Sequence, residues 1–258
     1  MKISIQEIID FLGDNILNLY GNTQDVFIDN IADADRVNET TLDWINPSKT
    51  NKQDIAEKSK AKVILVDTVI KYSPLLQNAD KVMIVVDRPK MILAKIISKF
   101  FIERKSHFIH PTAVIDKEAR IDETVFIDAG CVIGKVTIGK NTIIRANVCI
   151  YDDVVIGENC IVQAGSVIGT DGLGCTRETN GTLIKFPHIG GVIIGDSVEI
   201  GANCQIAKGA LSDTIISDGC KLNGMCFIAH NCVLEKNVWI TGSTMLSGST
   251  RVGANATI

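Results

Sequence analysis

The sequence has few aromatic residues, no block of basic residues and no long apolar run. Aromatic side chains make up only 5% of its 258 residues, although hydrophobic residues make up 46%, so we expect a core of repeated aliphatic side chains. The formal net charge is −4, and without a basic cluster the chain lacks the electrostatic footprint of a nucleic-acid partner. No stretch reaches the ~18–20 apolar residues of a transmembrane segment, and Glu7 and Asp10 argue against a secretory leader. These absences favour a cytoplasmic protein.

What the sequence does contain is a repeat in its second half. From Ile109 onward a branched aliphatic residue returns at every sixth position, with a one-residue slip after Ile133, a break over 170–191 and a second slip near Leu211. Neither a helix nor a strand has a six-residue period, whereas a hexapeptide β-solenoid does. If three hexapeptides close one triangular coil, residues eighteen apart lie directly above one another at the strand spacing of ~4.7–4.9 Å.

The cysteines follow the same repeat. Six of the eight lie two residues before an aliphatic repeat position, where other repeats carry small residues: Cys131, Cys160, Cys204, Cys220, Cys226 and Cys232. Because free cysteine packs as a small apolar side chain, we interpret this column as core. No Cys-x-x-Cys pair is present, so we expect reduced thiols and no metal site.

The first hundred residues lack the repeat and alternate between helical and strand patterns. The expected elements are a helix, three strands and a second helix, at Ile5–Leu17, Val26–Ile31, Val63–Val66, Val82–Val86 and Met91–Phe101. We therefore predict a small α/β domain over residues 1–105 and a β-helix over residues 106–258.

Several motifs in the repeat resemble one known family. They are Ile109-His110-Pro111-Thr112-Ala113, Thr170-Asp171-Gly172-Leu173-Gly174, Lys185-Phe186-Pro187-His188-Ile189-Gly190, Lys208-Gly209-Ala210-Leu211, Ile228-Ala229-His230-Asn231 and Leu246-Ser247-Gly248-Ser249. Together they look like the UDP-3-O-(3-hydroxyacyl)glucosamine N-acyltransferases of lipid A synthesis. The resemblance implies a left-handed parallel β-helix, a homotrimer, a nucleotide-contacting N-terminal domain, and acyl-CoA or acyl-carrier protein as co-substrate without a permanently bound cofactor.

The resemblance also assigns roles to two residues eighteen positions apart. It implies that His230 is the general base and that the backbone N–H of Gly248 stabilises the negative oxygen of the tetrahedral intermediate. The spacing places both groups on the same outer side of adjacent coils, where a base and a donor together suit acyl transfer. Free imidazole titrates near pH ~6.5 and can accept a proton at neutral pH. The alternative is a solvated histidine on the solenoid wall.

Six further residues are expected to contact the substrate. Four lie in the repeat: Asp171, Gly172, His188 and Asn231. The break around 170–191 resembles a loop that lines the active site in the family, although an ordinary surface excursion is the alternative. His188 stands where the family commonly has another polar residue.

In the first domain Trp44-Ile45-Asn46-Pro47 resembles the uracil-contacting stretch of the family. Asn46 is suited to hydrogen-bond a pyrimidine edge and Trp44 is suited to stack on the base, with core packing as the alternative for Trp44. Lys49 replaces a second stacking aromatic.

Departures from the family surround the substrate positions. Asn223-Gly224, Ala207-Lys208, Leu173 and Cys175 replace its Asp-Asn, Asp-Arg and aromatic pairs, and the chain stops at Ile258, before the family's C-terminal helices. These changes favour acylation of another nucleotide-linked amino-deoxysugar from acyl-CoA, for cell-surface glycans. UDP-3-O-(3-hydroxyacyl)glucosamine N-acylation with acyl-carrier protein is the alternative.

Functions from other classes fit less well. A γ-class carbonic anhydrase needs three histidine zinc ligands, and only His188 and His230 lie well inside the solenoid. A sugar-phosphate nucleotidyltransferase needs a glycine-rich phosphate loop near its start, which is absent here. A non-catalytic structural solenoid remains the alternative to an enzyme.

Overall fold

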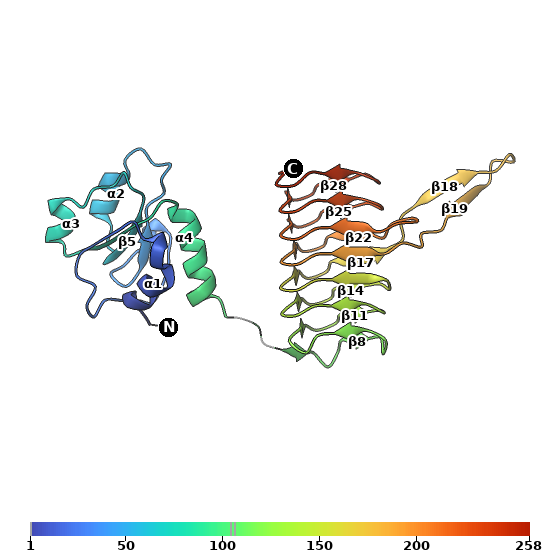
Figure 1. Ribbon diagram of the computed structural model, residues 1–258, viewed down its shortest axis with the longest axis horizontal. Helices are drawn as coiled ribbons and strands as arrows, with labels where there is room; N and C mark the ends of the chain where they lie inside the picture. Colours follow the sequence, from blue (N-terminus) through green and yellow to red (C-terminus); the bar gives the residue numbers. More distant parts are fainter. Residues whose placement is uncertain (1, 104, 106) are drawn as a thin grey trace. The chain divides into compact units, whose positions relative to one another are not determined.

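The protein is described by a computed structural model that covers residues 2–103, 105 and 107–258. The chain forms two compact units, Met1–Arg104 and Lys105–Ile258 (Figure 1). The predicted second domain begins at Ser106, and this residue lies outside the described residues.

The first unit is a small α/β domain. Its four-stranded sheet has the order β2-β6-β5-β4, in which β6, β5 and β4 are parallel and β2 is antiparallel to β6. The helical and strand elements are β1 (Ile3–Ser4), α1 (Ile5–Leu12), η1 (Gly13–Asn15), β2 (Asn18–Tyr20), β3 (Phe27–Ile28), η2 (Ala34–Arg36), β4 (Leu42–Trp44), α2 (Lys52–Lys58), β5 (Val63–Val66), α3 (Pro74–Asn78), β6 (Val82–Val85), α4 (Pro89–Ile96) and η3 (Ile97–Phe101).

Alternation along the central strands gives this sheet two buried faces. Val63 and Leu65 of β5 belong to one apolar cluster, with side chains of α1 and α4, whereas Ile64 and Val66 belong to a second cluster, with side chains of α2 and α3. Because successive side chains of a strand point to opposite faces, a continuous apolar run is what a strand covered on both sides requires.

The expected elements are present here, with different limits. The first helix ends at Leu12 because Gly13 adopts φ +47° and its N–H caps the carbonyl of Ile9. The strand expected over Val26–Ile31 is reduced to β3, and the second helix continues as the π-helical η3. Strands β2 and β4 and helices α2 and α3 were not predicted.

The second unit is a parallel β-helix with three walls of seven strands each. Wall 1 contains β7 (Phe108–Ile109), β10 (Phe126–Ile127), β13 (Ile143–Ile144), β16 (Ile161–Val162), β21 (Glu199–Ile200), β24 (Lys221–Leu222) and β27 (Trp239–Ile240). Wall 2 contains β8 (Val114–Ile115), β11 (Val132–Ile133), β14 (Cys149–Ile150), β17 (Val167–Thr170), β22 (Gln205–Ala207), β25 (Phe227–Ile228) and β28 (Met245–Leu246). Wall 3 contains β9 (Arg120–Ile121), β12 (Thr137–Ile138), β15 (Val154–Ile156), β20 (Val192–Ile194), β23 (Thr214–Ile216), β26 (Val233–Leu234) and β29 (Arg251–Val252). The prediction of an α/β domain followed by a parallel β-helix is confirmed.

The strand register follows the sequence repeat. Ile228 pairs with Leu246, eighteen residues later, whereas Ile127 pairs with Ile144 across the one-residue slip. The predicted aliphatic positions from Ile127 to Val252 are all buried and fill the axis of the prism. The six cysteines of the inward column are buried with them, and the thiols of all eight are free.

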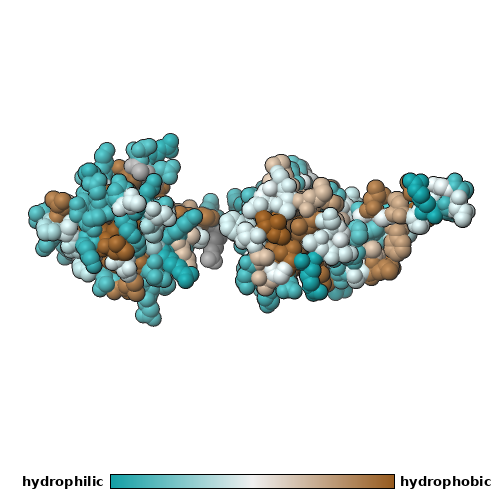
Figure 2. Space-filling model, turned by 90° about the horizontal axis from the view of Figure 1, so that it is seen from above, coloured by the Kyte–Doolittle hydropathy of each residue, from teal (hydrophilic) through white to brown (hydrophobic). Residues whose placement is uncertain are grey.

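Two excursions leave the solenoid at one corner, between walls 2 and 3. The larger one carries the antiparallel hairpin β18 (Gly174–Arg177) and β19 (Leu183–Phe186), here called the arm, which projects from the coils (Figure 1). The smaller excursion spans residues 208–213, between β22 and β23. Apolar surface lies along the arm in a view down the solenoid (Figure 2).

Among the described residues, no helix combines the length and the apolar character that crossing a bilayer requires. The same residues contain no group of three or more His, Cys, Asp or Glu side chains arranged to hold a metal ion.

Candidate active site

The structure brings His230 and Gly248 together at the corner between walls 2 and 3. His230 follows β25 and Gly248 follows β28, and these strands are neighbours in wall 2. A methyl group added at Gly248 would lie 2.6 Å from Cε1 and 2.7 Å from Nε2 of His230. The imidazole therefore packs directly against the glycine backbone, and this contact leaves no room for a side chain at residue 248.

Asn231 fixes which nitrogen of His230 carries the proton. Its Nδ2 donates to the carbonyl of Ser212 and its Oδ1 accepts the N–H of Ala210, both at 3.0 Å. The amide orientation is thus set by backbone groups, and Oδ1 lies 3.1 Å from Nδ1 of His230. Because an amide oxygen only accepts, Nδ1 of His230 donates, and the neutral ring keeps its lone pair on Nε2. Nε2 is the nitrogen that faces Gly248.

A second imidazole packs against the first. The rings of His188 and His230 are 5.1 Å apart at 76°, although the residues are distant in sequence. Only 5% of His188 is exposed, and its Nδ1 lies 3.0 Å from the carbonyl of Phe186. By the same logic, neutral His188 carries its lone pair on Nε2, and this buried atom has no hydrogen-bond partner within the described part of the chain.

Gly172 covers both rings. A methyl group at Gly172 would lie 2.5 Å from Nε2 of His188 and 3.0 Å from Cδ2 of His230. This glycine belongs to the short segment between β17 and the arm. His230 therefore contacts three other expected site residues, Gly172, His188 and Gly248.

Asp171 forms ion pairs at the base of the arm. Its carboxylate pairs with Lys185 of β19 and, at 3.3 Å, with Lys208 of the small excursion. The hydrogen bond from Lys185 and then that from Lys208 lower the pKa of Asp171 below its ordinary value. The carboxylate links the arm to the solenoid and leaves Lys208 beside a pocket of about 360 Å³ that Thr170 and Tyr151 also line.

The remaining two expected site residues, Trp44 and Asn46, lie in the first unit. Trp44 is partly buried and packs against the apolar cluster under α1 and α4. Asn46 accepts the N–H of Ser48 on its side-chain oxygen at 3.0 Å. Both residues line a pocket of about 530 Å³, together with Lys49.

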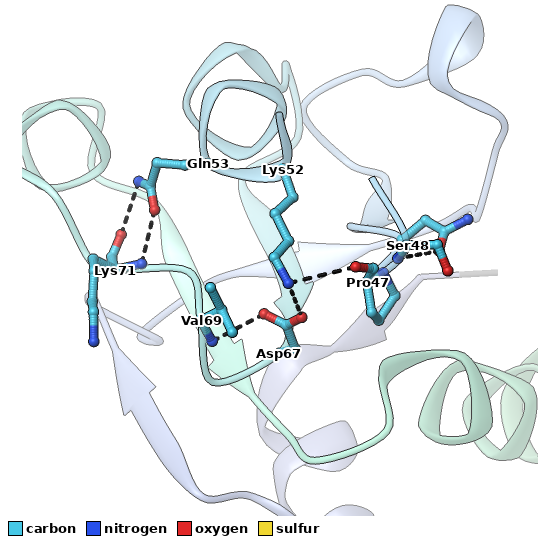
Figure 3. Close-up of polar contacts among 8 residues, drawn as sticks. Pro47, Ser48, Lys52, Gln53, Asp67, Val69 and Lys71 are labelled. Atoms are coloured by element: carbon cyan, nitrogen blue, oxygen red, sulfur yellow. Dashed lines mark hydrogen bonds and ion pairs between the residues drawn. The ribbon is translucent and has the colours of Figure 1, made fainter. Parts of the chain in front are cut away.

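A half-buried ion pair holds the chain that follows Asn46. Lys52 lies 2.5 Å from the carboxylate of Asp67, which also accepts the N–H of Val69 (Figure 3). The same ammonium group contacts the carbonyl of Pro47 at 3.5 Å. These contacts fix the turn beside the pocket.

Sequence reasoning did not identify all the residues that build the site. Ala210 orients Asn231 through its N–H and Ser212 through its carbonyl and hydroxyl oxygens, and the six-residue repeat does not predict these contacts. The sequence distinguished Lys208 as a departure from the family but did not predict its ion pair with Asp171. That pair depends on the path by which the arm rejoins the corner between walls 2 and 3. The six-residue repeat gave no means of placing the two excursions.

Comparisons with known proteins agree with this architecture. Residues 135–170 match the bacterial transferase hexapeptide (six repeats) family. A UDP-3-O-acylglucosamine N-acyltransferase of Coxiella burnetii (strain Dugway 5J108-111) is 33% identical over 246 residues, which cover 88% of this chain and 70% of that protein. One from Delftia acidovorans (strain DSM 14801 / SPH-1) is 35% identical over 262 residues, covering 100% of this chain and 76% of the relative.

The β-helix is also similar to solved structures of acyltransferases. The crystal structure of UDP-N-acetylglucosamine O-acyltransferase from Moraxella catarrhalis RH4 aligns with a TM-score of 0.41 at 25% identity. The alignment covers 58% of this chain, which spans 62% of that protein's length. This chain belongs to the UDP-3-O-acylglucosamine N-acyltransferase family as a hexapeptide-repeat N-acyltransferase.

Proposed function

We propose that this protein transfers an acyl group from a thioester to the amine of UDP-3-O-acylglucosamine, a step of lipid A synthesis. The observation that carries the proposal is the contact between the His230 imidazole and the Gly248 backbone, in a chain whose relatives bear that enzyme name. The sequence departures alone favoured another nucleotide-linked amino-deoxysugar. The relatives favour UDP-3-O-acylglucosamine instead, because the identity extends over most of the chain rather than over the scaffold alone.

The proposed chemistry uses His230 as the general base and Gly248 as the oxyanion donor. The acceptor amine attacks the thioester carbon while Nε2 of His230 removes a proton from the amine. The Gly248 N–H stabilises the negative oxygen of the tetrahedral intermediate. Collapse of the intermediate expels the thiolate, which takes the proton back from the imidazolium, so the products are an amide and a free thiol. Asn231 serves as a positioning residue, since its side-chain amide is already used in the contacts to Ala210, Ser212 and His230.

The other expected contacts keep their proposed roles. Trp44 and Asn46 contact the nucleotide base from the pocket of the first unit. Asp171 and Gly172 line the acceptor site at the base of the arm. The acyl donor is acyl-CoA or acyl-carrier protein, and neither is a permanently bound cofactor.

We further propose a homotrimer in which a neighbouring copy covers the arm. The arm exposes Leu183, Ile184 and Phe186, and an isolated two-stranded hairpin is marginally stable in water. The eight free thiols suit a reducing compartment, so we place the enzyme in the cytoplasm.

The test is mass spectrometry of products from purified protein. UDP-3-O-acylglucosamine and a dTDP-linked amino-deoxysugar are each offered with acyl-CoA and with acyl-carrier protein. We expect an amide product from the UDP acceptor, and a loss of about 100- to 10,000-fold in the folded His230→Ala trimer. Preferential acylation of the dTDP acceptor would replace the proposed acceptor. The absence of product and of ligand binding would favour a structural solenoid.

A further inference from the structure

The unpartnered nitrogen of His188 is the feature that the proposed mechanism does not use. Nε2 is buried beside the proposed general base, and among the residues that the structure describes no donor reaches this lone pair. A buried polar group without a partner costs free energy, so such an atom at a reaction site suggests a donor supplied by the ligand. The groups around it are the backbone of Gly172 and the ring of His230, neither of which presents an N–H to it.

The acceptor amine is a donor of the required kind. A hydroxyl nucleophile carries one hydrogen, which the general base takes. A neutral amine carries two, so after one points to His230 a second remains in need of an acceptor. A site with two acceptor nitrogens can therefore accept both hydrogens of an amine. A hydroxyl has only one hydrogen, so its oxygen lone pair would face the lone pair of the second nitrogen.

Access to His188 depends on the segment 171–173. In the described chain no backbone N–H of these three residues donates a hydrogen bond, and the segment is held through the exposed ion pairs of Asp171. Gly172 presents only its backbone to Nε2. Because the segment lies outside the strands of the walls, a small shift of it would uncover the nitrogen and leave the coils in place.

We propose that His188 is an amine-selecting residue: its Nε2 accepts one N–H of the acceptor amine while His230 accepts another. This inference rests on the proposed function and explains how the site distinguishes an amine from a hydroxyl at the same position of the sugar. His188 also holds the amine so that the nitrogen lone pair faces the thioester carbon.

The kinetic test compares UDP-3-O-acylglucosamine with its analogue that carries a hydroxyl in place of the amine. For His188→Phe we expect kcat/KM of the amine acceptor to fall about tenfold while the Ki of the hydroxyl analogue stays within about twofold. His188→Gln, whose amide oxygen can accept, should recover part of the loss. If both acceptors weaken by the same factor, or the amine is unaffected, the role of His188 is rejected. A wild-type enzyme that does not acylate the amine rejects the proposed function instead.

A spectroscopic measurement reports on the wild-type protein itself, and a variant serves only to assign the resonance. The chain has four histidines, so the ring nitrogens of His188 can be assigned in ¹⁵N spectra by comparison with His188→Phe or His188→Gln. With a non-reactive thioether analogue of the donor present, the amine acceptor should move the Nε2 resonance toward the hydrogen-bonded position. The hydroxyl analogue should not. An unchanged Nε2 resonance with bound amine acceptor overturns the proposal.

Discussion

At the scale of single residues, the site depends on a tautomer and on a missing side chain. Asn231 accepts the Nδ1–H of His230, so that Nε2 keeps the lone pair that the proposed base requires. Gly248 leaves space for the ring because it has no Cβ. Each feature can be removed by one substitution that leaves the solenoid core untouched.

Replacing Asn231 by Leu removes the acceptor of Nδ1–H. The ring of His230 is then free to exchange its proton between nitrogens, and a fraction of molecules presents N–H instead of a lone pair to the amine. We expect kcat to fall about 10- to 100-fold with a smaller change in KM. Steady-state kinetics across pH measures both parameters.

Asn231→Gly is the control for backbone strain, because Asn231 adopts φ +60°. The Gly variant should lose as much activity as Asn231→Leu but should be more stable than it. Full activity in both variants would show that the amide does not position the base.

Replacing Gly248 by Ala places a methyl group within 3 Å of the imidazole. The ring must rotate away from its position, so we expect kcat/KM to fall by about 100-fold or more while the protein stays folded. Gly253 is the matched control, because a methyl group there meets no atom within 4 Å. Equal activity of Gly248→Ala and Gly253→Ala would contradict the packing of His230 against Gly248.

At the scale of structural elements, the coils were predictable and the excursions were not. A repeat that buries every sixth residue determines strand positions and register together, because a shifted register would expose the core positions. The stacking of His230 beneath Gly248 followed from that register. By contrast, the contact between His188 and His230 depends on how the arm returns to its corner, and no periodic pattern encodes that path. In the first unit, β4 and α2 were missed because Asp43 and the polar residues of α2 interrupt the apolar patterns.

Corners of the solenoid contain a strained residue that can be improved. Met225 adopts φ +60°, a left-handed conformation that its neighbours one coil away, Asn203 and Ser243, also adopt. Asparagine tolerates this conformation better than methionine. Met225→Asn should therefore raise the free energy of unfolding by about 0.5–1 kcal/mol, measured by urea denaturation. Met245 is a matched exposed methionine in a strand, and Met245→Asn should give no gain. A destabilised Met225→Asn variant would contradict strain at this corner.

At the scale of the whole molecule, the column of cysteines makes the solenoid sensitive to alkaline pH. The thiol of Cys204 donates to the carbonyl of Asn223 at 3.1 Å inside the prism, and burial raises its pKa from 9.0 to about 11. Burial also raises the pKa values of Cys131, Cys160, Cys220 and Cys232. The folded state therefore keeps these protons at a pH where the unfolded chain has released them.

A raised pKa gives a definite sign to the pH dependence. The stabilisation is fully present below the unfolded pKa of 9.0 and is lost as pH rises through the folded value of about 11. We expect the urea midpoint to fall between these values, with Cys204 alone contributing on the order of 2 kcal/mol. Cys204→Ala is less stable at pH 8, because a buried sulfur and its contact with the Asn223 carbonyl are lost, but its midpoint should fall less steeply with pH. Cys175 is exposed on the arm, so Cys175→Ala should retain the wild-type slope. Parallel slopes for wild type and Cys204→Ala would mean that the inward thiols do not control alkaline unfolding, and that lysine or tyrosine titration does.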